Sequence, residues 1–261
     1  MSLTKGRQVI ELLKSIETGD TGPIAFINPN KYIQHNLAVA DGLAGFGEVI
    51  SQLPKGSARV NTVRVFSDGD YVVAHTEYNF FGLKVGFDIF RFEDGKITEH
   101  WDNLQATVEK TASRRSQTDG PTAIVDLDKT EANKNLVKDL VSKVFLGGQF
   151  EKITDYISAS QYDQHNPYVA DGLNALSQAV QEMAKAGTPM VYTQNHLVLG
   201  EGNFVLAVSE GIFMGKQSSF YDLFRIEGGK VVEHWDTIEE IPMRSEWRNT
   251  NGKFNFPAKI N

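Results

Sequence analysis

The tetrapeptide Glu-His-Trp-Asp occurs twice in this chain of 261 residues, at positions 99–102 and 233–236. Side chains two residues apart on an extended strand point to the same face. His100 would therefore lie beside Asp102, and His234 beside Asp236. Burial raises the pKa of a carboxyl group toward that of imidazole, so each pair is a candidate for proton transfer with the aspartate as general base.

The same residues also allow a purely structural explanation. Across a hairpin, Arg91 and Thr98 would share the face of His100 and Asp102, which describes an ion-pair strip on a solvated surface. That arrangement follows if the buried face carries the alternate set of side chains, namely Phe90, Phe92, Ile97 and Trp101. Because a β-bulge reverses such a parity argument, the residues alone leave both interpretations open.

Other chemistries find little support in the sequence. The six histidines are scattered at positions 35, 75, 100, 165, 196 and 234, with no His-x-x-x-His pair and no tight run of carboxylates. This spacing predicts no metal site. A P-loop, a dinucleotide fingerprint and a Gly-x-Ser-x-Gly elbow are also missing from the sequence, so we expect no cofactor and no serine nucleophile.

Internal repetition organises the chain. The segment "YIQHNLAVADGL" from Tyr32 matches "YDQHNPYVADGL" from Tyr162 at 9 of 12 positions, and "DIFRFEDGKITEHWD" from Asp88 matches "DLFRIEGGKVVEHWD" from Asp222 at 10 of 15. The offsets are 130 and 134 residues, a drift that small loop insertions explain. We interpret the chain as a tandem duplication with a first copy at 1–115, a linker at 116–128, a second copy at 129–250 and a tail at 251–261.

Each copy begins with helical periodicity and continues with strand periodicity. Apolar residues at helical spacing predict helices around 9–16 and 136–145, and in the first copy strands are predicted at 58–66, 70–80, 84–92 and 96–106. The "EDGK" and "EGGK" segments are typical of tight hairpin turns. Helices followed by an antiparallel sheet predict an α+β class, with the helices on one face of the sheet.

The point at which the copies differ gives a further candidate. His75 lies on a strand face with Tyr71 and Glu77. In the second copy the position of the histidine is Val208, whereas the glutamate is retained as Glu210. A histidine that exchanges with valine is expected to point inward, where it titrates near neutral pH. Either it lines a pocket, which would make the first copy the active one, or it is a hydrogen-bonded core histidine.

The repeated "QHN" segment supplies His35 and His165. Each histidine precedes the aspartate of "ADGL" at a loop, where side chains commonly reach a binding site. The alternative is local turn chemistry by the neighbouring asparagines.

Taken together, these segments resemble the SnoaL-like proteins of the nuclear transport factor 2-like superfamily. The resemblance rests on "QHN" followed by "ADG", the histidine of "VVAHTE" and the closing "DIFRFEDGKITEHWD", and it covers each repeat. It implies two tandem cone-shaped α+β domains, with helices packed on a curved sheet. It also implies a pocket position for Asp102 and Asp236. Asp88 and Asp222 match the place of a proton-donating acid in steroid isomerases, although we favour an ion pair with a neighbouring arginine.

The resemblance and the residue patterns together give a set of expected pocket-lining side chains. Those of the first copy are Tyr71, Glu77, Asp88 and Trp101, and those of the second copy are Glu210, Asp222 and Trp235.

Composition limits the partners. The formal net charge of −7 and the pI of about 5.4 disfavour binding to nucleic acid. No apolar run approaches the roughly 18 residues that cross a bilayer, and the N-terminal segment carries acidic residues unlike a secretion signal. We therefore expect a cytoplasmic protein, and the resemblance to SnoaL-like proteins implies a small hydrophobic molecule as partner. Superfamily members often dimerise, so an internal pseudo-dimer of the two copies is also expected, and a further homo-oligomer stays open.

Our leading hypothesis is a cofactor-free enzyme acting on a small hydrophobic carbonyl compound. Asp102 would abstract a proton α to the carbonyl, and His35 or His75 would donate a hydrogen bond to the enolate oxygen, giving an aldol cyclisation or an isomerisation. The second copy would repeat the scheme with Asp236 and His165. The alternatives are a non-catalytic ligand-binding or structural module, and hydration chemistry of the dehydratase or epoxide hydrolase type. Superfamily members differ widely in activity, so the fold does not decide among them.

Overall fold

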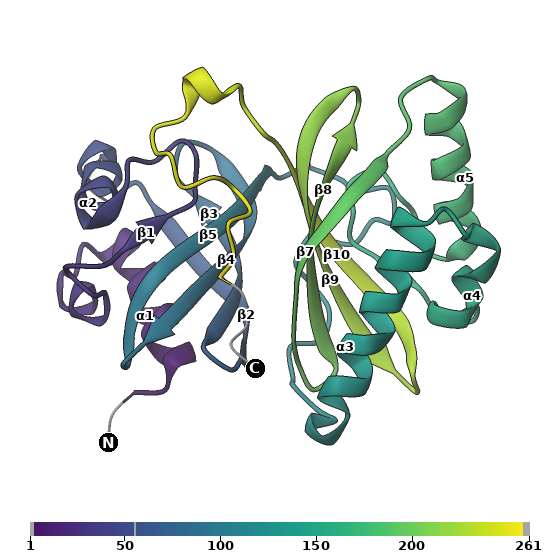
Figure 1. The fold of residues 1–261 in the computed structure, drawn as a ribbon, viewed down its shortest axis with the longest axis horizontal. Coiled ribbons are helices and arrows are strands. Elements are labelled where there is room, and N and C mark those ends of the chain that lie inside the picture. The colour runs from purple at the N-terminus through teal and green to yellow at the C-terminus, as the bar shows by residue number, and fades with distance from the viewer. Residues whose placement is uncertain (1–2, 55, 258–261) are drawn as a thin grey trace. The chain divides into compact units, whose positions relative to one another are not determined.

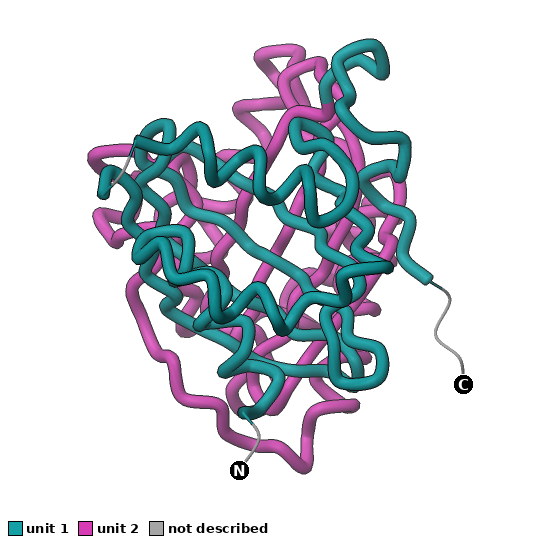
Figure 2. The backbone as a smooth tube through the Cα atoms, turned by 90° about the vertical axis from the view of Figure 1, so that its left-hand side faces the viewer, with its two compact units in different colours: residues 1–106, 242–261 teal, residues 107–241 magenta. Residues whose placement is uncertain are grey.

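The computed structural model describes residues 3–54 and 56–257 and divides into two compact units (Figures 1 and 2). Unit 1 combines the residues up to Ala106 with those from Pro242 onward, and unit 2 runs from Thr107 to Ile241. The division falls directly after the last strand of each copy. Unit 2 therefore includes the segment that was expected to end the first copy and to link it to the second.

Unit 1 is a mixed five-stranded sheet with helices. Its helices are α1 (Lys5–Thr18), η1 (Gly22–Phe26), α2 (Gly42–Gln52) and η5 (Arg244–Glu246). Its strands are β1 (Ile33–Gln34), β2 (Arg59–Asp68), β3 (Tyr71–Asn79), β4 (Leu83–Glu93) and β5 (Lys96–Ala106), in the spatial order β1-β5-β4-β3-β2.

Unit 2 repeats this plan. Its helices are η2 (Leu127–Lys129), α3 (Thr130–Asp139), its π-helical continuation η3 (Leu140–Leu146), η4 (Phe150–Lys152), α4 (Ile153–Tyr156) and α5 (Leu173–Lys185). Its strands are β6 (Asp163–Gln164), β7 (Val191–Glu201), β8 (Phe204–Phe213), β9 (Lys216–Glu227) and β10 (Lys230–Glu240), in the order β6-β10-β9-β8-β7.

The predicted α+β class is confirmed, and the strands lie within a few residues of their predicted bounds. Period-2 sequence and turn chemistry explain this accuracy: Asp94 and Gly95 adopt φ of 48° and 75°, as a two-residue hairpin turn requires. The short strand β1 was not predicted. It pairs in parallel with β5, through Ile33 to Glu99 and Gln34 to His100, and so places the "QHN" segment beside the "EHWD" segment.

Each sheet has one face that packs on its helices. In unit 1, Val9 and Leu12 of α1 belong to the same apolar core as Val72, Ala74 and Phe90. Phe90 pairs directly with His100 across β4 and β5, and Asp88 pairs with Asp102. Cross-strand partners share a face, so His100 and Asp102 lie on the helix-facing side of the sheet.

A register shift explains why the parity argument was ambiguous. The pairing of β4 with β5 shifts between Arg91 and Phe92, so Ile97 and His100, three residues apart, both face the helices. The expected set was therefore right for three of its four residues. Phe90, Phe92 and Ile97 are core residues, whereas Trp101 lies on the opposite face.

Each unit is completed by a segment that follows the last strand of the other copy. We name residues 242–257, which belong to unit 1, the C-arm, and residues 107–123, which belong to unit 2, the L-arm. Arg248 N of the C-arm donates to Leu37 O at 2.8 Å, and Ala112 N of the L-arm donates to Pro167 O at 3.0 Å. The arms therefore occupy equivalent positions in the two units.

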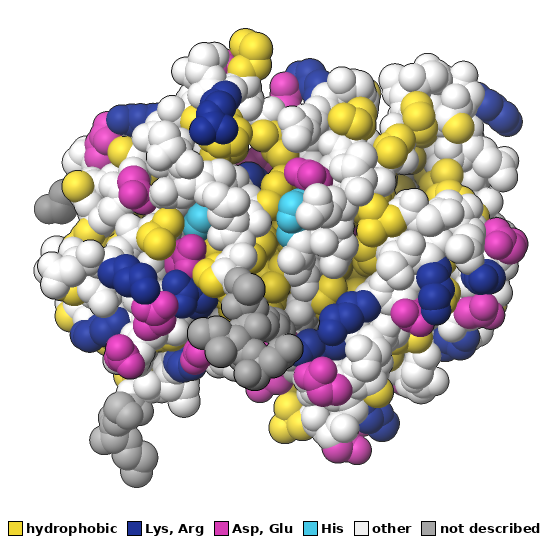
Figure 3. Space-filling view, in the orientation of Figure 1, with side chains coloured by type: hydrophobic (Ala, Val, Ile, Leu, Met, Phe, Trp, Pro, Cys, Tyr) yellow, Lys and Arg dark blue, Asp and Glu magenta, His cyan; other side chains and the backbone are white. Residues whose placement is uncertain are grey.

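The surface mixes charges of both signs. On the face shown in Figure 3, basic and acidic side chains are interspersed on each unit. Among the described residues, no helix is both long enough and apolar enough to span a membrane.

Candidate active site

Three buried polar side chains meet on the helix-facing side of unit 1. His100 Nε2 lies 3.0 Å from Asp88 Oδ1, and Asn36 Nδ2 donates to Asp102 Oδ2 at 2.7 Å. One atom from each of Asp88, His100 and Asp102 lies within 4.8 Å of the others. We call this group site 1. The sequence-based statement that no tight carboxylate cluster exists was wrong, because the pairing of β4 with β5 brings Asp88 beside Asp102, 14 positions further along the chain.

Unit 2 contains the same arrangement, which we call site 2. His234 Nε2 lies 3.0 Å from Asp222 Oδ1, and Asn166 Nδ2 donates to Asp236 Oδ2 at 2.6 Å. The expected pair of Asp88 or Asp222 with an arginine is not found. In both units the aspartate contacts the histidine, while Arg91 and Arg225 point to glutamates.

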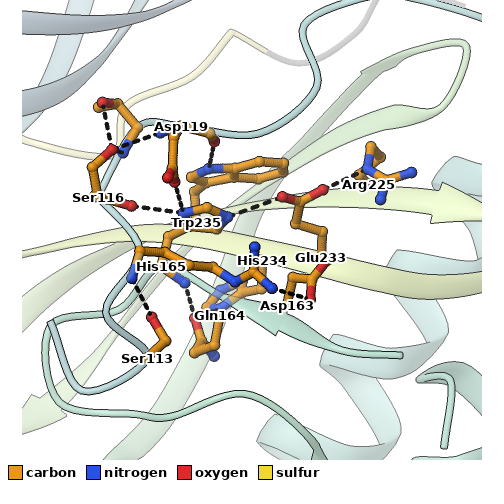
Figure 4. Close-up of polar contacts among 12 residues, drawn as sticks. Ser113, Ser116, Asp119, Asp163, Gln164, His165, Arg225, Glu233, His234 and Trp235 are labelled. Carbon is orange, nitrogen blue, oxygen red and sulfur yellow. Dashed lines mark hydrogen bonds and ion pairs between the residues drawn. The ribbon is translucent and has the colours of Figure 1, made fainter. Parts of the chain in front are cut away.

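A glutamine fixes the proton on each site histidine. Gln34 Oε1 accepts a hydrogen bond from Asn36 N at 2.9 Å, so this oxygen cannot be exchanged with the amide nitrogen. His100 Nδ1, 3.0 Å from the same oxygen, must therefore donate. In unit 2, Gln164 Oε1 accepts from two backbone amides and from His234 Nδ1 at 2.9 Å, as the contacts around Gln164 in Figure 4 illustrate. Each Nε2 is thus left to share a proton with the aspartate.

A tyrosine hydroxyl reaches the same aspartate in both units, but from different strands. In unit 1, Tyr78 of β3 donates to Asp88 Oδ2 at 2.6 Å. In unit 2 the corresponding position of β8 is Gly211, and Tyr192 of the neighbouring strand β7, paired with Gly211, lies 3.2 Å from both oxygens of Asp222. The pairing of the hydroxyl with the aspartate has been kept although its source has moved across the sheet.

Burial dominates the electrostatics of both sites. It raises the pKa of Asp88 despite the hydrogen bond and charge of His100, and it raises the pKa of Asp236 from an ordinary 3.8 to about 6. Burial opposes the charge on His234, but the hydrogen bond to Asp222 and the charges of Asp236 and Asp222 outweigh it and raise the pKa of that imidazole. A carboxyl group whose pKa is raised to about 6 is suited to exchange a proton near neutral pH.

One carboxylate oxygen in each site remains open. Asn36 and Asn166 each hold one oxygen of the adjacent aspartate, and the other oxygen has no hydrogen-bond partner among residues 3–54 and 56–257, although Asp102 and Asp236 are only 5% and 6% exposed. In unit 1 the ammonium of Lys253, from the C-arm, lies 3.9 Å from Asp102 Oδ1. Buried polar atoms without partners are uncommon and indicate a place for a ligand or a reacting group.

His35 and His165 lie elsewhere, in a second network on the opposite face of each sheet. His35 stacks on Trp101, contacts Glu99 Oε1 at 2.9 Å and meets the C-arm at Gly252 O at 2.6 Å. His165 repeats this with Trp235, Glu233 and Ser116 O of the L-arm, as Figure 4 shows. Both ring nitrogens of each histidine lie within hydrogen-bond distance of oxygen atoms.

The glutamate in this second network lies between an arginine and a histidine. Arg225 Nε donates to Glu233 Oε2 at 2.6 Å, and Arg91 makes the same bond to Glu99. Burial favours neutral Glu233, but the hydrogen bonds from His165 and Arg225 outweigh it and lower its pKa. The network joins each arm to its sheet and does not touch the open carboxylate oxygen.

The expected convergence of His75 with Asp102 is also not found. His75 pairs with Phe87 across β3 and β4, stacks on its ring, and contacts Arg64 at 3.2 Å, all on the face opposite Asp102. The parity of β3 explains the error, since Ala74 and Tyr78 take the helix-facing positions. The same face of the sheet in unit 1 carries Tyr71, Glu77 and Trp101, and the equivalent face in unit 2 carries Glu210 and Trp235. Of the expected pocket-lining residues, only Asp88 and Asp222 therefore reach the sites.

The sequence reasoning missed several residues that build the sites. Gln34 and Asn36, with their second-copy equivalents, flank the histidine of "QHN" and were available as a signal, because the motif recurs in full. Tyr78 and Tyr192 gave no repeat signal, since they come from non-equivalent positions. Lys253 reaches site 1 from the other end of the chain.

Comparison with known proteins gives likeness to solved structures only. No protein family model matches the chain, and no curated protein matches it. Similar structures include an NTF2-like protein of unknown function from Cytophaga hutchinsonii (14% identity, TM-score 0.35, 40% of this chain and 93% of that one). A putative polyketide cyclase from Bacillus cereus has 20% identity and a TM-score of 0.33 over 38% of this chain and 72% of that one. A putative ketosteroid isomerase from Kribbella flavida has 12% identity and a TM-score of 0.34 over 45% and 90%. At these identities the likeness concerns the fold.

Proposed function

We propose that unit 1 catalyses proton transfer at a carbon next to a carbonyl group in a small hydrophobic compound, with Asp102 as the general base. The observation that carries this proposal is the open oxygen of Asp102. Asn36 fixes the other oxygen of the carboxylate, and His100 and Asp88 stand beside it. A buried carboxylate oriented in this way and left with a free lone pair has the geometry of a proton acceptor.

The charge that develops on the substrate needs a donor, and Tyr32 is the candidate. Burial and the negative charges of Asp102 and Asp88 raise the pKa of Tyr32, which keeps its hydroxyl protonated. In the proposed step the C–H bonding pair becomes the enolate, Asp102 Oδ1 takes the proton, and a neutral hydroxyl donates to the enolate oxygen. Return of the proton at another carbon gives an isomerisation, and attack of the enolate on a second carbonyl gives an aldol cyclisation. Tyr32 thus takes the role that we had expected for His35 or His75.

The proposal is tested by following deuterium uptake into a panel of cyclic and polyketide-like ketones in D2O by mass spectrometry. We expect Asp102→Asn to slow exchange about 100-fold or more, the usual contribution of a general base. Asp70→Asn, a change at an exposed residue paired with Lys5, is the matched control and should exchange at the wild-type rate. Melting curves must show that both variants are folded.

Two outcomes would count against the proposal. Equal exchange by wild type and Asp102→Asn would remove Asp102 from the base role. Ligand binding without exchange in any tested ketone would favour a non-catalytic binding module.

A further inference from the structure

Site 2 presents three potential ligand atoms from one side. One potential ligand atom from each of Asp222, His234 and Asp236 lies within 4.8 Å of the others, and all three residues are buried. Asp236 Oδ1 has no hydrogen-bond partner among the described residues. The site therefore combines a cluster of anionic and imidazole groups with a buried, unpartnered oxygen.

Each of the three side chains is also held from behind. Gln164 Oε1 accepts from His234 Nδ1, Asn166 Nδ2 donates to Asp236 Oδ2, and the hydroxyl of Tyr192 contacts Asp222. Partners of this kind fix the tautomer and the orientation of metal ligands in proteins. With Nδ1 committed to Gln164, the lone pair or proton of Nε2 faces the cluster.

The spacing fits an ion of ordinary size. Two ligand atoms about 2.1 Å from a metal, at right angles, are about 3.0 Å apart. His234 Nε2 and Asp222 Oδ1 are 3.0 Å apart, so an ion could replace the proton between them with little movement. The open oxygen of Asp236 would complete a three-residue face.

Site 1 differs from site 2 in the charge beside its open oxygen. The ammonium of Lys253 lies 3.9 Å from the open oxygen of Asp102, and both side chains are buried. The arms can be aligned through two equivalent hydrogen bonds, Gly252 O with Ser116 O and Arg248 N with Ala112 N, both at an offset of 136 residues. At that offset the counterpart of Lys253 in the L-arm is Gln117, which is uncharged.

We propose that site 2 binds one divalent first-row transition-metal ion through Asp222, His234 and Asp236, and that Lys253 takes the place of this charge in site 1. A ligand set of one imidazole and two carboxylates favours Mn²⁺, Fe²⁺ or Zn²⁺, whereas a site built of oxygens alone favours Mg²⁺ or Ca²⁺. The chain thus carries one metal-binding copy and one copy whose resident cation is an ammonium. This inference is independent of catalysis at Asp102.

The test measures bound metal directly. After the full-length protein is stripped with EDTA and dialysed against Mn²⁺ or Co²⁺, elemental analysis should give one ion per chain, and bound Co²⁺ should show a visible spectrum of mixed nitrogen and oxygen ligation. Asp236→Asn should weaken binding by about 100-fold or more, and Asn166→Ala by about 10- to 100-fold, as for partners of ligands. Asp102→Asn, the matched change in site 1, should bind as wild type does.

Two single substitutions in the arms test whether the charge at this position decides which site binds the ion. Lys253→Gln should raise the stoichiometry to two ions per chain, and Gln117→Lys should lower it to none. These changes leave every proposed ligand in place, so they remain informative if a ligand variant fails to fold. No bound ion at millimolar Mn²⁺, two ions in the wild type, or affinity unchanged in Asp236→Asn would each overturn the proposal. Ketone exchange is measured separately, so failure of one proposal is distinguishable from failure of the other.

Discussion

The raised pKa of Asp236 makes a quantitative prediction about stability. Its carboxyl group titrates near 3.8 when unfolded and at about 6 in the folded chain, because burial disfavours the charge. The unfolded state therefore ionises first as pH rises, and folding loses free energy between these two values. From pH 4 to pH 6.5 this loss amounts to about 2 kcal/mol. It is absent below the unfolded pKa and complete above the folded one.

Asp236→Asn removes the titrating group and keeps an amide of the same shape. In the presence of EDTA, the stability of unit 2 in this variant should fall by about 2 kcal/mol less than that of the wild type between pH 4 and pH 6.5. The measured difference also includes the change at His234, whose raised pKa depends in part on the charge of Asp236.

The assay uses urea unfolding followed by tryptophan fluorescence. Trp235 is the only tryptophan in unit 2, so a Trp101→Phe, Trp247→Phe background reports on that unit alone. Parallel pH profiles for the two proteins would refute the reasoning, because they would show that Asp236 is solvated well enough to ionise normally.

Three further predictions concern the frame around the sites. Tyr78→Phe and Tyr192→Phe should each lower stability by about 1–3 kcal/mol, because each leaves a buried aspartate short of one donor; equal melting of wild type and variants would contradict the contacts. Glu233→Gln should cost about 1–3 kcal/mol, because it removes a buried carboxylate that contacts both His165 and Arg225, whereas Glu227→Gln, at a glutamate 68% exposed, should change the melting temperature little. Gly211→Ala should destabilise by about 1–3 kcal/mol because the new Cβ would meet Val191 O at 1.9 Å. Gly47→Ala, in open space on α2, should instead stabilise by about 0.5–1 kcal/mol, and the reverse order of the two melting temperatures would argue against the packing around Gly211.

The sequence predicted the positions of the helices and strands well, but it predicted poorly which face of the sheet each side chain occupies. Strand positions followed from local patterns such as the Asp94-Gly95 turn. The side of the sheet occupied by a side chain depended on the register shift beside Arg91, which no local pattern marks. His100 and Asp102 were recognised as a pair, whereas His75 was placed on the wrong side of β3.

Residues brought in from distant segments were the hardest to foresee. Gln34 reaches His100 because a two-residue strand pairs in parallel with β5, and such a strand carries too few residues for a periodic signal. Lys253 lies about 150 positions from Asp102 in the sequence and meets it only because the C-arm packs on unit 1. Composition and residue spacing do not show that the segment after the last strand of the second copy packs on unit 1.

Each unit is completed by the arm that follows the last strand of the other copy, and this affects the order in which the two units can fold during synthesis. Chains are synthesised from the N-terminus, and domains generally fold as they emerge. The sheet of unit 1 is complete once Ala106 has left the ribosome, yet Gly252, which holds His35, is made only after the whole of unit 2. Unit 2, by contrast, receives its arm before its own first strand. Site 1 therefore lacks Lys253 throughout synthesis of unit 2, and the unit whose sheet is made first is completed after the other.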